Sequence, residues 1–342
     1  MTVRVAAIGL GALGSIESRL LSETEGVRVV AGSDPTPSAR ETFEADHDLP
    51  SYADYGTMLD EHALDAVSIV TPHTVHAEQV AACLDRGLHV HVEKPMTTDL
   101  DDAAALCELA GTNELVLQVG YQRHFDPRFR EIKRVIEEGR IGVPQMAACH
   151  LEQDWLSIAE GTWRVNPELS GGGQLYDSGS HLLDALLWTT GTTPRAVAAV
   201  TDSRGERVDI DTALALTLDR EDGTMTASAG VTGDGPTGPD TGEGLFVWGS
   251  EGAVEFDGET IAVTEGGHTY RTTITEGTDF ETVTRRKLEA FVAAVRGERE
   301  PAVPGEFGLR VVALTEAAYE AAEEGRTIDV GERLDRVMDR IP

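Results

Sequence analysis

The first 120 residues alternate between short apolar runs and amphipathic segments, and this alternation constrains the fold more than any other feature of the chain. Runs of strand type begin at Val3, Val27, Ala66, Leu88 and Leu115, and helical patterns lie between them. Strands that alternate with helices of about 10 to 15 residues are typical of βαβ units, whose strands pair in parallel. We therefore expect this part of the chain to form an α/β domain with a doubly wound parallel sheet.

The first apolar run leads into the sequence GLGALG, residues 9–14, and this sequence opens a helical pattern. A GxGxxG between a strand and a helix is typical of dinucleotide-binding Rossmann domains. Its first glycine forms a tight turn, its second lets the pyrophosphate approach, and its third lets the helix pack closely.

Asp34 lies 20 residues after Gly14, at the end of the second strand. Its carboxylate would bond the adenosine ribose and repel a 2′-phosphate, so we expect NAD rather than NADP. The alternative is a structural turn with a surface Asp.

Ligands of a doubly wound sheet bind at the carboxyl ends of its strands. The residues expected there are Gly9, Asp34, Thr71, Pro72, Glu93, Lys94, Pro95, Gly120 and Tyr121. Lys94 stands out, because only three of the 28 basic residues are lysines, namely Lys94, Lys133 and Lys287. An arginine would supply charge alone, so a lysine at this edge indicates a role in giving up or relaying a proton. The alternative is an ordinary surface lysine at a strand end.

After Tyr121 the pattern changes from alternation to consecutive strands. A helical pattern over 126–139 precedes a strand near 146–155, and five strand-like runs follow between residues 195 and 266. Runs joined by short turns favour an antiparallel meander. We therefore expect a second domain, which is also α/β but has a mainly antiparallel sheet.

The remaining segments complete this division of the chain. Residues 233–244 have the composition of a loop, and two helical patterns close the chain, near 280–297 and 306–324. We expect a dinucleotide-binding domain over residues 1–120 and a second domain over residues 121–342.

The charge of the chain is extreme, at −32 with 60 acidic residues. The acids are dispersed and lysine is depleted, which indicates adaptation to molar salt, where a Debye length of about 3 Å screens self-repulsion. The alternative is a surface for a cation or a basic partner. So acidic a surface argues against nucleic acid as a partner.

The chain has no long apolar stretch and its start runs into a strand, so we expect a cytoplasmic protein without a membrane segment.

The cysteines and histidines give little support for a metal site. The three cysteines are scattered singly, which argues against a disulfide framework and a cysteine-bound metal. His73 and His76 have HxxH spacing, and His89 and His91 have HxH spacing. Because they have no thiolate partner and lie on an expected helix and strand, we expect no metal.

A second cluster of candidate catalytic residues is GGGQLYDSGSHLLD, residues 171–184. If the chain is helical from Tyr176, Asp177 and His181 lie at positions i and i+4 on one face. A carboxylate beside an imidazole orients the ring and favours its protonated form, which suits a general base for an alcohol proton. The alternative is a helix cap next to an ordinary surface histidine.

Six segments together resemble the Gfo/Idh/MocA family, in order and spacing: GLGALG, TPHTVH, HVEKP, GYQRHFDPRF, WRVNPELSGGGQLYDSGSHLLD and EAAEEGRTIDV. That family groups glucose–fructose oxidoreductase, inositol dehydrogenase and the rhizopine catabolism proteins, and the similarity spans nearly the whole chain. It implies a Rossmann domain followed by an α/β domain whose open-faced sheet forms a homodimer or homotetramer. Two positions depart from the family pattern, His73 in place of the frequent Asn and His124 in place of a second Arg.

The resemblance implies NAD-dependent oxidation of a secondary hydroxyl of a sugar, a polyol such as inositol, or a related compound. His181 would act as acid and base, Lys94 would assist at the hydroxyl, and Asp177 would position both His181 and the substrate. The candidate cofactor contacts are Gly9, Leu10, Gly11, Ala12, Leu13, Gly14, Asp34, Thr71, Pro72, His76, Glu93, Lys94 and Arg123. The candidate substrate contacts are Lys94, Tyr121, Asp154, Trp155, Arg164, Asp177 and His181. The alternatives are an NAD-dependent glycosidase with transient oxidation and a non-catalytic nucleotide sensor.

Overall fold

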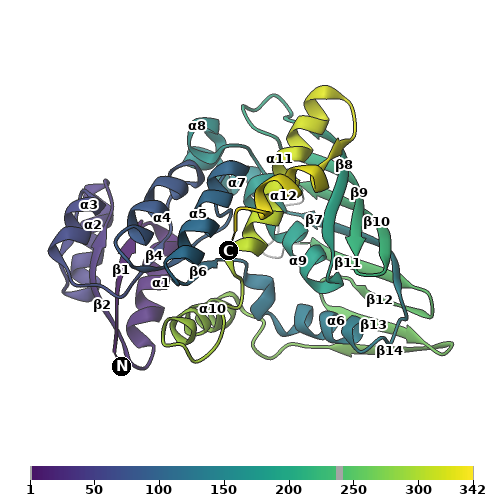
Figure 1. The fold of residues 1–342 in the computed structure, drawn as a ribbon, viewed down its shortest axis with the longest axis horizontal. Coiled ribbons are helices and arrows are strands. Elements are labelled where there is room, and N and C mark those ends of the chain that lie inside the picture. Colours follow the sequence, from purple (N-terminus) through teal and green to yellow (C-terminus); the bar gives the residue numbers. More distant parts are fainter. Residues whose placement is uncertain (1, 236–241, 342) are drawn as a thin grey trace. The chain divides into compact units, whose positions relative to one another are not determined.

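The computed structural model describes residues 2–235 and 242–341, which divide into two compact units (Figure 1). Unit 1 comprises Met1–Gln122, Phe280–Leu309 and Asp339–Pro342, and unit 2 comprises Arg123–Asp279 and Arg310–Met338. Two later segments of the chain therefore belong to unit 1. The predicted division into residues 1–120 and 121–342 assigns these segments to the second domain. None of the described helices is long and apolar enough to cross a membrane.

Unit 1 is built on a parallel sheet, with the strand order β3-β2-β1-β4-β5-β6. The strands are β1 (Val3–Ile8), β2 (Val27–Ser33), β3 (Ser51–Tyr52), β4 (Ala66–Ile69), β5 (His89–Val92) and β6 (Leu117–Val119). This confirms the doubly wound parallel sheet predicted from the alternation. The sequence did not indicate β3, because a strand of two residues has no periodicity to detect.

The helices of unit 1 include one from the far end of the sequence. They are α1 (Ala12–Glu23), α2 (Pro37–His47), α3 (Tyr55–Glu61), the 3-10 turn η1 (His73–Val75), α4 (His76–Leu84), α5 (Leu100–Thr112) and α10 (Phe280–Val295). Leu288 and Phe291 of α10 join a buried core with Val3 of β1 and Leu20 of α1. The core next to the glycine-rich turn is therefore completed by α10.

Unit 2 is built on a mixed, mostly antiparallel sheet, with the order β14-β13-β12-β11-β7-β10-β9-β8-β15. The strands are β7 (Pro144–Glu152), β8 (Thr193–Asp202), β9 (Asp211–Arg220), β10 (Gly223–Thr232), β11 (Gly242–Gly249), β12 (Gly252–Phe256), β13 (Thr260–Glu265), β14 (His268–Thr273) and β15 (Ile328–Asp329). Strand β7 lies between two meanders and pairs in parallel with β10. The predicted mainly antiparallel sheet is confirmed.

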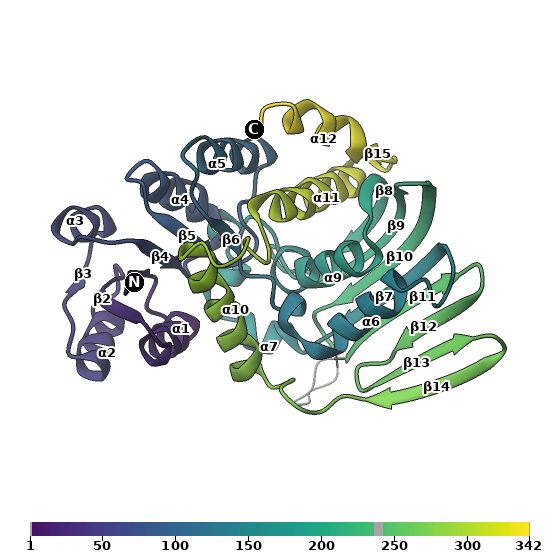
Figure 2. The ribbon, with the colours of Figure 1, turned by 60° about the horizontal axis from the view of Figure 1, so that its bottom comes forward.

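The helices of unit 2 are α6 (Pro127–Glu137), α7 (Trp155–Ala159), the 3-10 turn η3 (Trp163–Val165), α8 (Pro167–Ser170), the π-helix η4 (Leu175–Gly179), α9 (Ser180–Thr190) and α12 (Val330–Met338). Two elements, the 3-10 turn η2 (Gln122–Phe125) and α11 (Gly305–Glu324), have residues in both units. Figure 2 shows α6 and α9 side by side on one face of the large sheet. Among the described residues the opposite face carries no helix (Figure 1). The strand register puts Met146, Val200 and Trp248 on one face, where they are exposed at 45%, 72% and 38%.

Two predictions about unit 2 need correction. The chain does not close with two helices, because α12 follows α11 after the turn at Gly325 and the short strand β15. The predicted loop over residues 233–244 ends earlier than expected, since Gly242 already pairs with Glu152 at the start of β11. The part of that loop over residues 236–241 lies outside the described residues.

Candidate active site

The glycine-rich turn connects β1 to α1, and each of its glycines meets a different steric demand. Gly9 has a φ of 93°, and a Cβ atom there would lie 2.1 Å from the carbonyl oxygen of Val70. A Cβ atom on Gly14 would lie 2.0 Å from the carbonyl oxygen of Gly9, so the helix passes very close to the turn. A Cβ atom on Gly11 would have no other described atom within 4 Å. This open side of Gly11 leaves room for a phosphate to approach the backbone.

Asp34 is bonded to the glycine-rich turn. Its Oδ2 accepts a hydrogen bond from the N–H of Leu10 at 2.9 Å, and its Oδ1 accepts one from Thr36 at 2.8 Å. Helix α1 begins after Gly11 without a capping side chain among the described residues, so its first N–H groups are available to an anion. The residues present therefore fit a dinucleotide, with the α1 terminus, including Ala12 and Leu13, for its phosphates and Asp34 for its ribose.

Residues that follow β4 lie beside the same turn. The hydroxyl of Thr71, which precedes Pro72, donates to Oε1 of Gln79 at 2.6 Å. His76 is fully buried, with Nδ1 2.8 Å from the carbonyl oxygen of Pro95 and Nε2 2.9 Å from that of Thr71. Burial lowers the pKa of His76, so a neutral ring donates to one of the two oxygens. His76 thus ties two backbone segments together, and its predicted contact with the cofactor stays a prediction.

Glu93 and Lys94 follow β5. The N–H of Lys94 donates to Oε2 of Glu93 at 3.2 Å, and the ammonium group of Lys287 donates to the other oxygen of the same carboxylate. Lys94 itself is half-buried, and its peptide bond to Pro95 is cis. Glu93, a predicted cofactor contact, is therefore bonded within unit 1.

In unit 2 the centre of the predicted catalytic cluster is Asp177. It is buried, and its Oδ2 accepts hydrogen bonds from Nε1 of Trp155 at 2.7 Å and from Nε of Arg164 at 3.0 Å. The guanidinium group of Arg164 lies over the ring of Trp163, 4.7 Å from its centroid. The structure therefore brings together three predicted substrate residues, with Trp155 and Arg164 as donors that fix the Asp177 carboxylate.

The helix that carries Asp177 and His181 is not the regular α-helix expected from Tyr176. Residues Leu175–Gly179 form a π-helix, in which the N–H of Gly179 donates to the carbonyl oxygen of Gln174 at 2.8 Å, and α9 starts at Ser180. A π-helix has more residues per turn than an α-helix, and the chain runs from it directly into α9. The predicted placement of Asp177 and His181 on one face therefore stays a prediction. A Cβ atom on Gly179 would lie 3.1 to 3.3 Å from three neighbouring atoms, which explains why glycine suits this tight turn.

Two residues that the sequence did not indicate hold the glycine-rich segment before Asp177. The carboxylate of Asp209 accepts from the N–H of Gly173 at 2.7 Å, from the N–H of Leu175 at 2.9 Å and from the hydroxyl of Tyr319 at 2.5 Å. A Cβ atom on Gly173 would lie 2.0 Å from the carbonyl oxygen of Asp209. The run of glycines was the signal that another segment approaches closely. We call these bonds the Asp209 clamp.

The other predicted site residues have the following places. Arg123 donates from Nε and Nη2 to the carboxylate of Glu243 at 3.2 and 3.1 Å, so its guanidinium group is bonded within unit 2. Asp154 is the residue before α7, and Tyr121 is fully buried in unit 1. His124, one of the two departures from the family pattern, has Nε2 2.9 Å from Oδ1 of the buried Asp184.

Both units match one family of known proteins. Residues 3–121 match the domain described as "Oxidoreductase family, NAD-binding Rossmann fold", and residues 133–330 match the family's C-terminal alpha/beta domain. The chain is 30% identical over 336 residues to D-xylose 1-dehydrogenase (NADP(+)) 2 of Haloferax volcanii, covering 94% of this chain and 97% of that protein. It is 27% identical over 346 residues to inositol 2-dehydrogenase of Rhizobium meliloti, covering 96% and 100%.

A solved structure supports the same assignment. The aldose-aldose oxidoreductase from Caulobacter crescentus, in complex with glycerol, is 25% identical and superposes with a TM-score of 0.81 over 96% of this chain and 100% of that chain. The chain therefore belongs to the Gfo/Idh/MocA family of oxidoreductases.

Proposed function

We propose that this protein is an NAD-dependent dehydrogenase that oxidises a secondary hydroxyl of a sugar, an inositol or a related polyol. The observation that carries the proposal is the glycine-rich turn, where the open side of Gly11 and the α1 terminus lie beside the carboxylate of Asp34. Dehydrogenases for xylose and inositol among the relatives support this class of substrate. When bound, NAD supplies the hydride acceptor.

The chain's own residues would manage the proton and the alignment of the substrate. His181 removes the hydroxyl proton as a general base, and Lys94 bonds the reacting oxygen and relays the proton. Asp177, whose carboxylate is fixed by Trp155 and Arg164, orients the substrate and His181. A fixed carboxylate places its partners with little loss of entropy on binding, which favours a reactive arrangement.

We propose NAD over NADP because of Asp34. A 2′-phosphate would have to approach a carboxylate already held at the turn by Leu10 and Thr36, and like charges in a desolvated site repel by several kcal/mol. Arg40 is the nearby cation that would favour NADP, but its Nη1 donates to the carbonyl oxygens of Asp34 and Pro35 at 2.7 and 3.0 Å. The name of the Haloferax volcanii relative specifies NADP(+), so titration calorimetry with both cofactors is the deciding comparison.

We further propose that a second copy of the chain covers the open face of the unit 2 sheet. The face presents the exposed apolar side chains of Met146, Val200 and Trp248, and apolar surface of this kind favours contact with another protein. Light scattering during gel filtration tests this proposal. We expect a dimer or tetramer for the wild type and monomers for the double variant Val200→Glu, Trp248→Glu.

The acidic composition leads us to propose adaptation to high salt. At a net charge of −32, repulsion within the protein is long-ranged in dilute buffer and is screened near 1 M salt. The melting temperature should therefore rise steeply with KCl. A flat or falling melting temperature would show that the acids are adequately paired.

The test of the proposed activity is a panel of D-xylose, myo-inositol, scyllo-inositol, related sugars and their glycosides, with NAD or NADP, in KCl from low to molar concentration. We expect net formation of NADH, followed by its absorbance, with at least one compound. Binding of NAD without turnover on the whole panel would favour a nucleotide sensor, and cleavage of a glycoside without net NADH would favour a glycosidase.

A further inference from the structure

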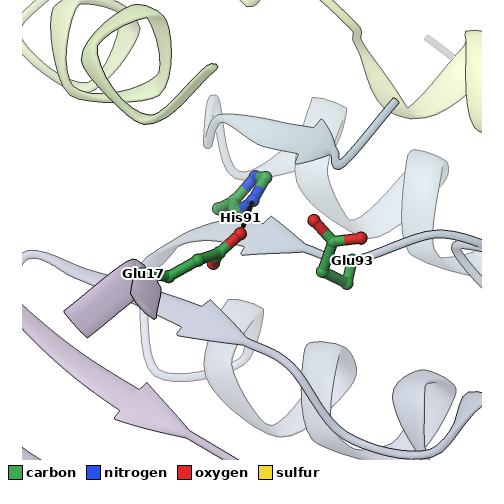
Figure 3. Close-up of side chains that lie close together, drawn as sticks. All are labelled: Glu17, His91 and Glu93. Carbon is green, nitrogen blue, oxygen red and sulfur yellow. Dashed lines mark ion pairs between the residues drawn. The ribbon is translucent and has the colours of Figure 1, made fainter. Parts of the chain in front are cut away.

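A buried cluster of charged and titratable groups lies in unit 1, next to the strand end that carries Lys94. Figure 3 shows the side chains of Glu17 from α1 and His91 from β5 meeting, with Glu93 beside them. Lys287 of α10 completes the cluster. Glu17, His91 and Lys287 are at most 1% exposed and Glu93 is 5% exposed, so water cannot solvate these charges.

Hydrogen bonds join the groups of this cluster. The ammonium group of Lys287 donates to Oε1 of Glu17 at 2.7 Å and to Oε1 of Glu93, and the hydroxyl of Ser68 donates to Oε2 of Glu17 at 2.8 Å. Burial alone would lower the pKa of Lys287 and raise that of Glu17, but their mutual attraction shifts both pKa values the opposite way. Lys287 and Glu17 are therefore charged at neutral pH. The ammonium group supplies the positive charge that a metal ion would bring to Glu17, His91 and Glu93.

One carboxylate joins this cluster to Lys94. While Oε1 of Glu93 accepts from Lys287, Oε2 accepts from the backbone N–H of Lys94 at 3.2 Å. Gly120 leaves room for this carboxylate, because a Cβ atom there would lie 2.5 Å from Oε1 of Glu93. A shift of the ammonium group of Lys287 would therefore move the carboxylate of Glu93, which also accepts the hydrogen bond from the backbone N–H of Lys94.

The backbone of Lys287 is held by a side chain from strand β6. The amide Nε2 of Gln118 donates to the carbonyl oxygen of Lys287 at 3.1 Å, and Oε1 of Gln118 accepts from the N–H of Ala302 at 3.3 Å. Leu288 and Phe291, on the same helix, pack into the core of the unit. The ammonium group thus has little freedom to move.

We propose that Lys287 is a positioning residue for the reaction, which acts by holding Glu93 and thereby the backbone and side-chain direction of Lys94. The inference rests on the proposed function, in which Lys94 meets the substrate. Buried ion pairs add little net stability compared with apolar replacements, so stability alone is a weak reason for two buried carboxylates around one lysine. Arginine, which this chain uses almost everywhere else, has a broad planar fork in place of a compact ammonium group and would not fit the enclosed space between Glu17 and Glu93.

The experiment is a double-mutant cycle on the holoenzyme in molar KCl, with the compound of the sugar and inositol panel that the wild type oxidises fastest. Lys287→Met, Lys94→Ala and the double variant are compared for kcat, for KM and for the NAD dissociation constant. Misplacing a catalytic group by about 1 Å costs up to about 100-fold. We therefore expect Lys287→Met to lower kcat by about 10- to 100-fold while NAD binding changes by less than about 3-fold.

The double variant separates positioning from a purely structural role. If Lys287 acts through Lys94, Lys287→Met should lower kcat by less than about 2-fold in the Lys94→Ala background. Equal losses in both backgrounds would overturn the inference and leave the proposed function intact. A Lys94→Ala enzyme with wild-type kcat would overturn the proposed role of Lys94 and this inference with it.

Two further variants keep the test informative if Lys287→Met fails to fold. Gly120→Ala removes no charge but pushes the end of the Glu93 side chain away, so it should also lower kcat in the wild-type background and not in the Lys94→Ala background. The matched control is Glu17→Gln, which breaks the other ion pair of Lys287 and should lower the melting temperature with kcat kept within about 3-fold. A Gly120→Ala enzyme that binds NAD and retains full kcat would overturn the inference.

Discussion

Unit 1 and unit 2 hold their predicted catalytic residues in two different ways. In unit 1 the ammonium group of Lys287 holds the carboxylate of Glu93, next to Lys94, by an ion pair. In unit 2 the carboxylate of Asp209 holds the segment before Asp177 through two backbone N–H groups and the hydroxyl of Tyr319. In both places a side chain from another part of the sequence holds a segment that carries a predicted catalytic residue.

The difference lies in the cost of breaking each arrangement. Removing one partner of a buried ion pair leaves an uncompensated charge, which typically costs about 3 to 5 kcal/mol. Removing one acceptor from a set of neutral donors leaves an unpaired N–H or O–H, which costs about 1 to 3 kcal/mol. We therefore expect loss of the Lys287 ammonium group to affect both stability and rate, and variants of the Asp209 clamp to affect mainly the segment that carries Asp177.

The largest loss of kcat should come from replacing His181, the proposed base in unit 2. His181→Asn should lower kcat by about 10³-fold, within the range that general acid and base groups contribute. Oxidation needs a base to accept the hydroxyl proton, so wild-type activity should rise with pH through one ionisation that is lost in the variant. Steady-state rates across pH check this. A pH profile that is unchanged in His181→Asn would show that Lys94 or another group acts as the base.

The corresponding change in unit 1 is Lys94→Arg. Arginine keeps the positive charge but cannot give up a proton, and its planar group is broader than an ammonium group. We expect NAD to bind nearly as well as to the wild type, with a loss of about 10²-fold in kcat. Binding titrations beside steady-state rates separate the two quantities. A variant that retains most of its kcat would reduce Lys94 to a source of charge.

The features predicted correctly from the sequence were those that neighbouring residues determine. The strand, the glycine-rich turn and helix α1 follow one another directly, so periodicity and Gly9 were enough to predict them. Lys287 could not be assigned this way, because its partners Glu17 and Glu93 lie 270 and 194 residues away. Asp209 lies 110 residues from Tyr319, and no spacing rule connects them.

The scarcity of lysine is a weaker guide to function than expected. Lys133 donates to the carbonyl oxygen of Trp188 at 3.0 Å and pairs with Glu137 at 2.8 Å, and Lys287 is a buried ion-pair partner. Lysine is therefore also used where a compact ammonium group fits between oxygen atoms. The π-helix before α9 likewise depends on the packing around Gly179, which the sequence pattern does not reveal.

A smaller effect should come from loosening the Asp209 clamp. Asp209→Asn places an amide donor against N–H and O–H donors, so we expect about a 10-fold loss of kcat as the Asp177 segment loosens, with NAD binding unchanged. Tyr319→Phe, the matched control, removes one donor and should cost less. Equal effects of the two variants would show that the carboxylate is not the organising group.

The smallest effect concerns stability and pH. The folded-state pKa of Glu17 is lowered from 4.5, so its contribution to stability is present above about pH 4.5 and is lost as the pH falls towards the folded value. The wild type should therefore lose more unfolding free energy between pH 7 and pH 3 than Glu17→Gln does. Denaturant titrations at both pH values measure the difference. Parallel losses would mean that the Lys287 pair contributes nothing to the acid sensitivity.

The central claim is that a hydride passes from a secondary hydroxyl carbon to the nicotinamide, with His181 and Lys94 managing the proton. The most direct test uses the best compound of the sugar and inositol panel, deuterated at its reacting carbon, and mass spectrometry of the reduced cofactor. We predict one deuterium on the nicotinamide ring for each molecule of NADH formed, and no labelled cofactor with His181→Asn above a trace. Unlabelled NADH, or labelled NADH formed at the wild-type rate by His181→Asn, would contradict the account.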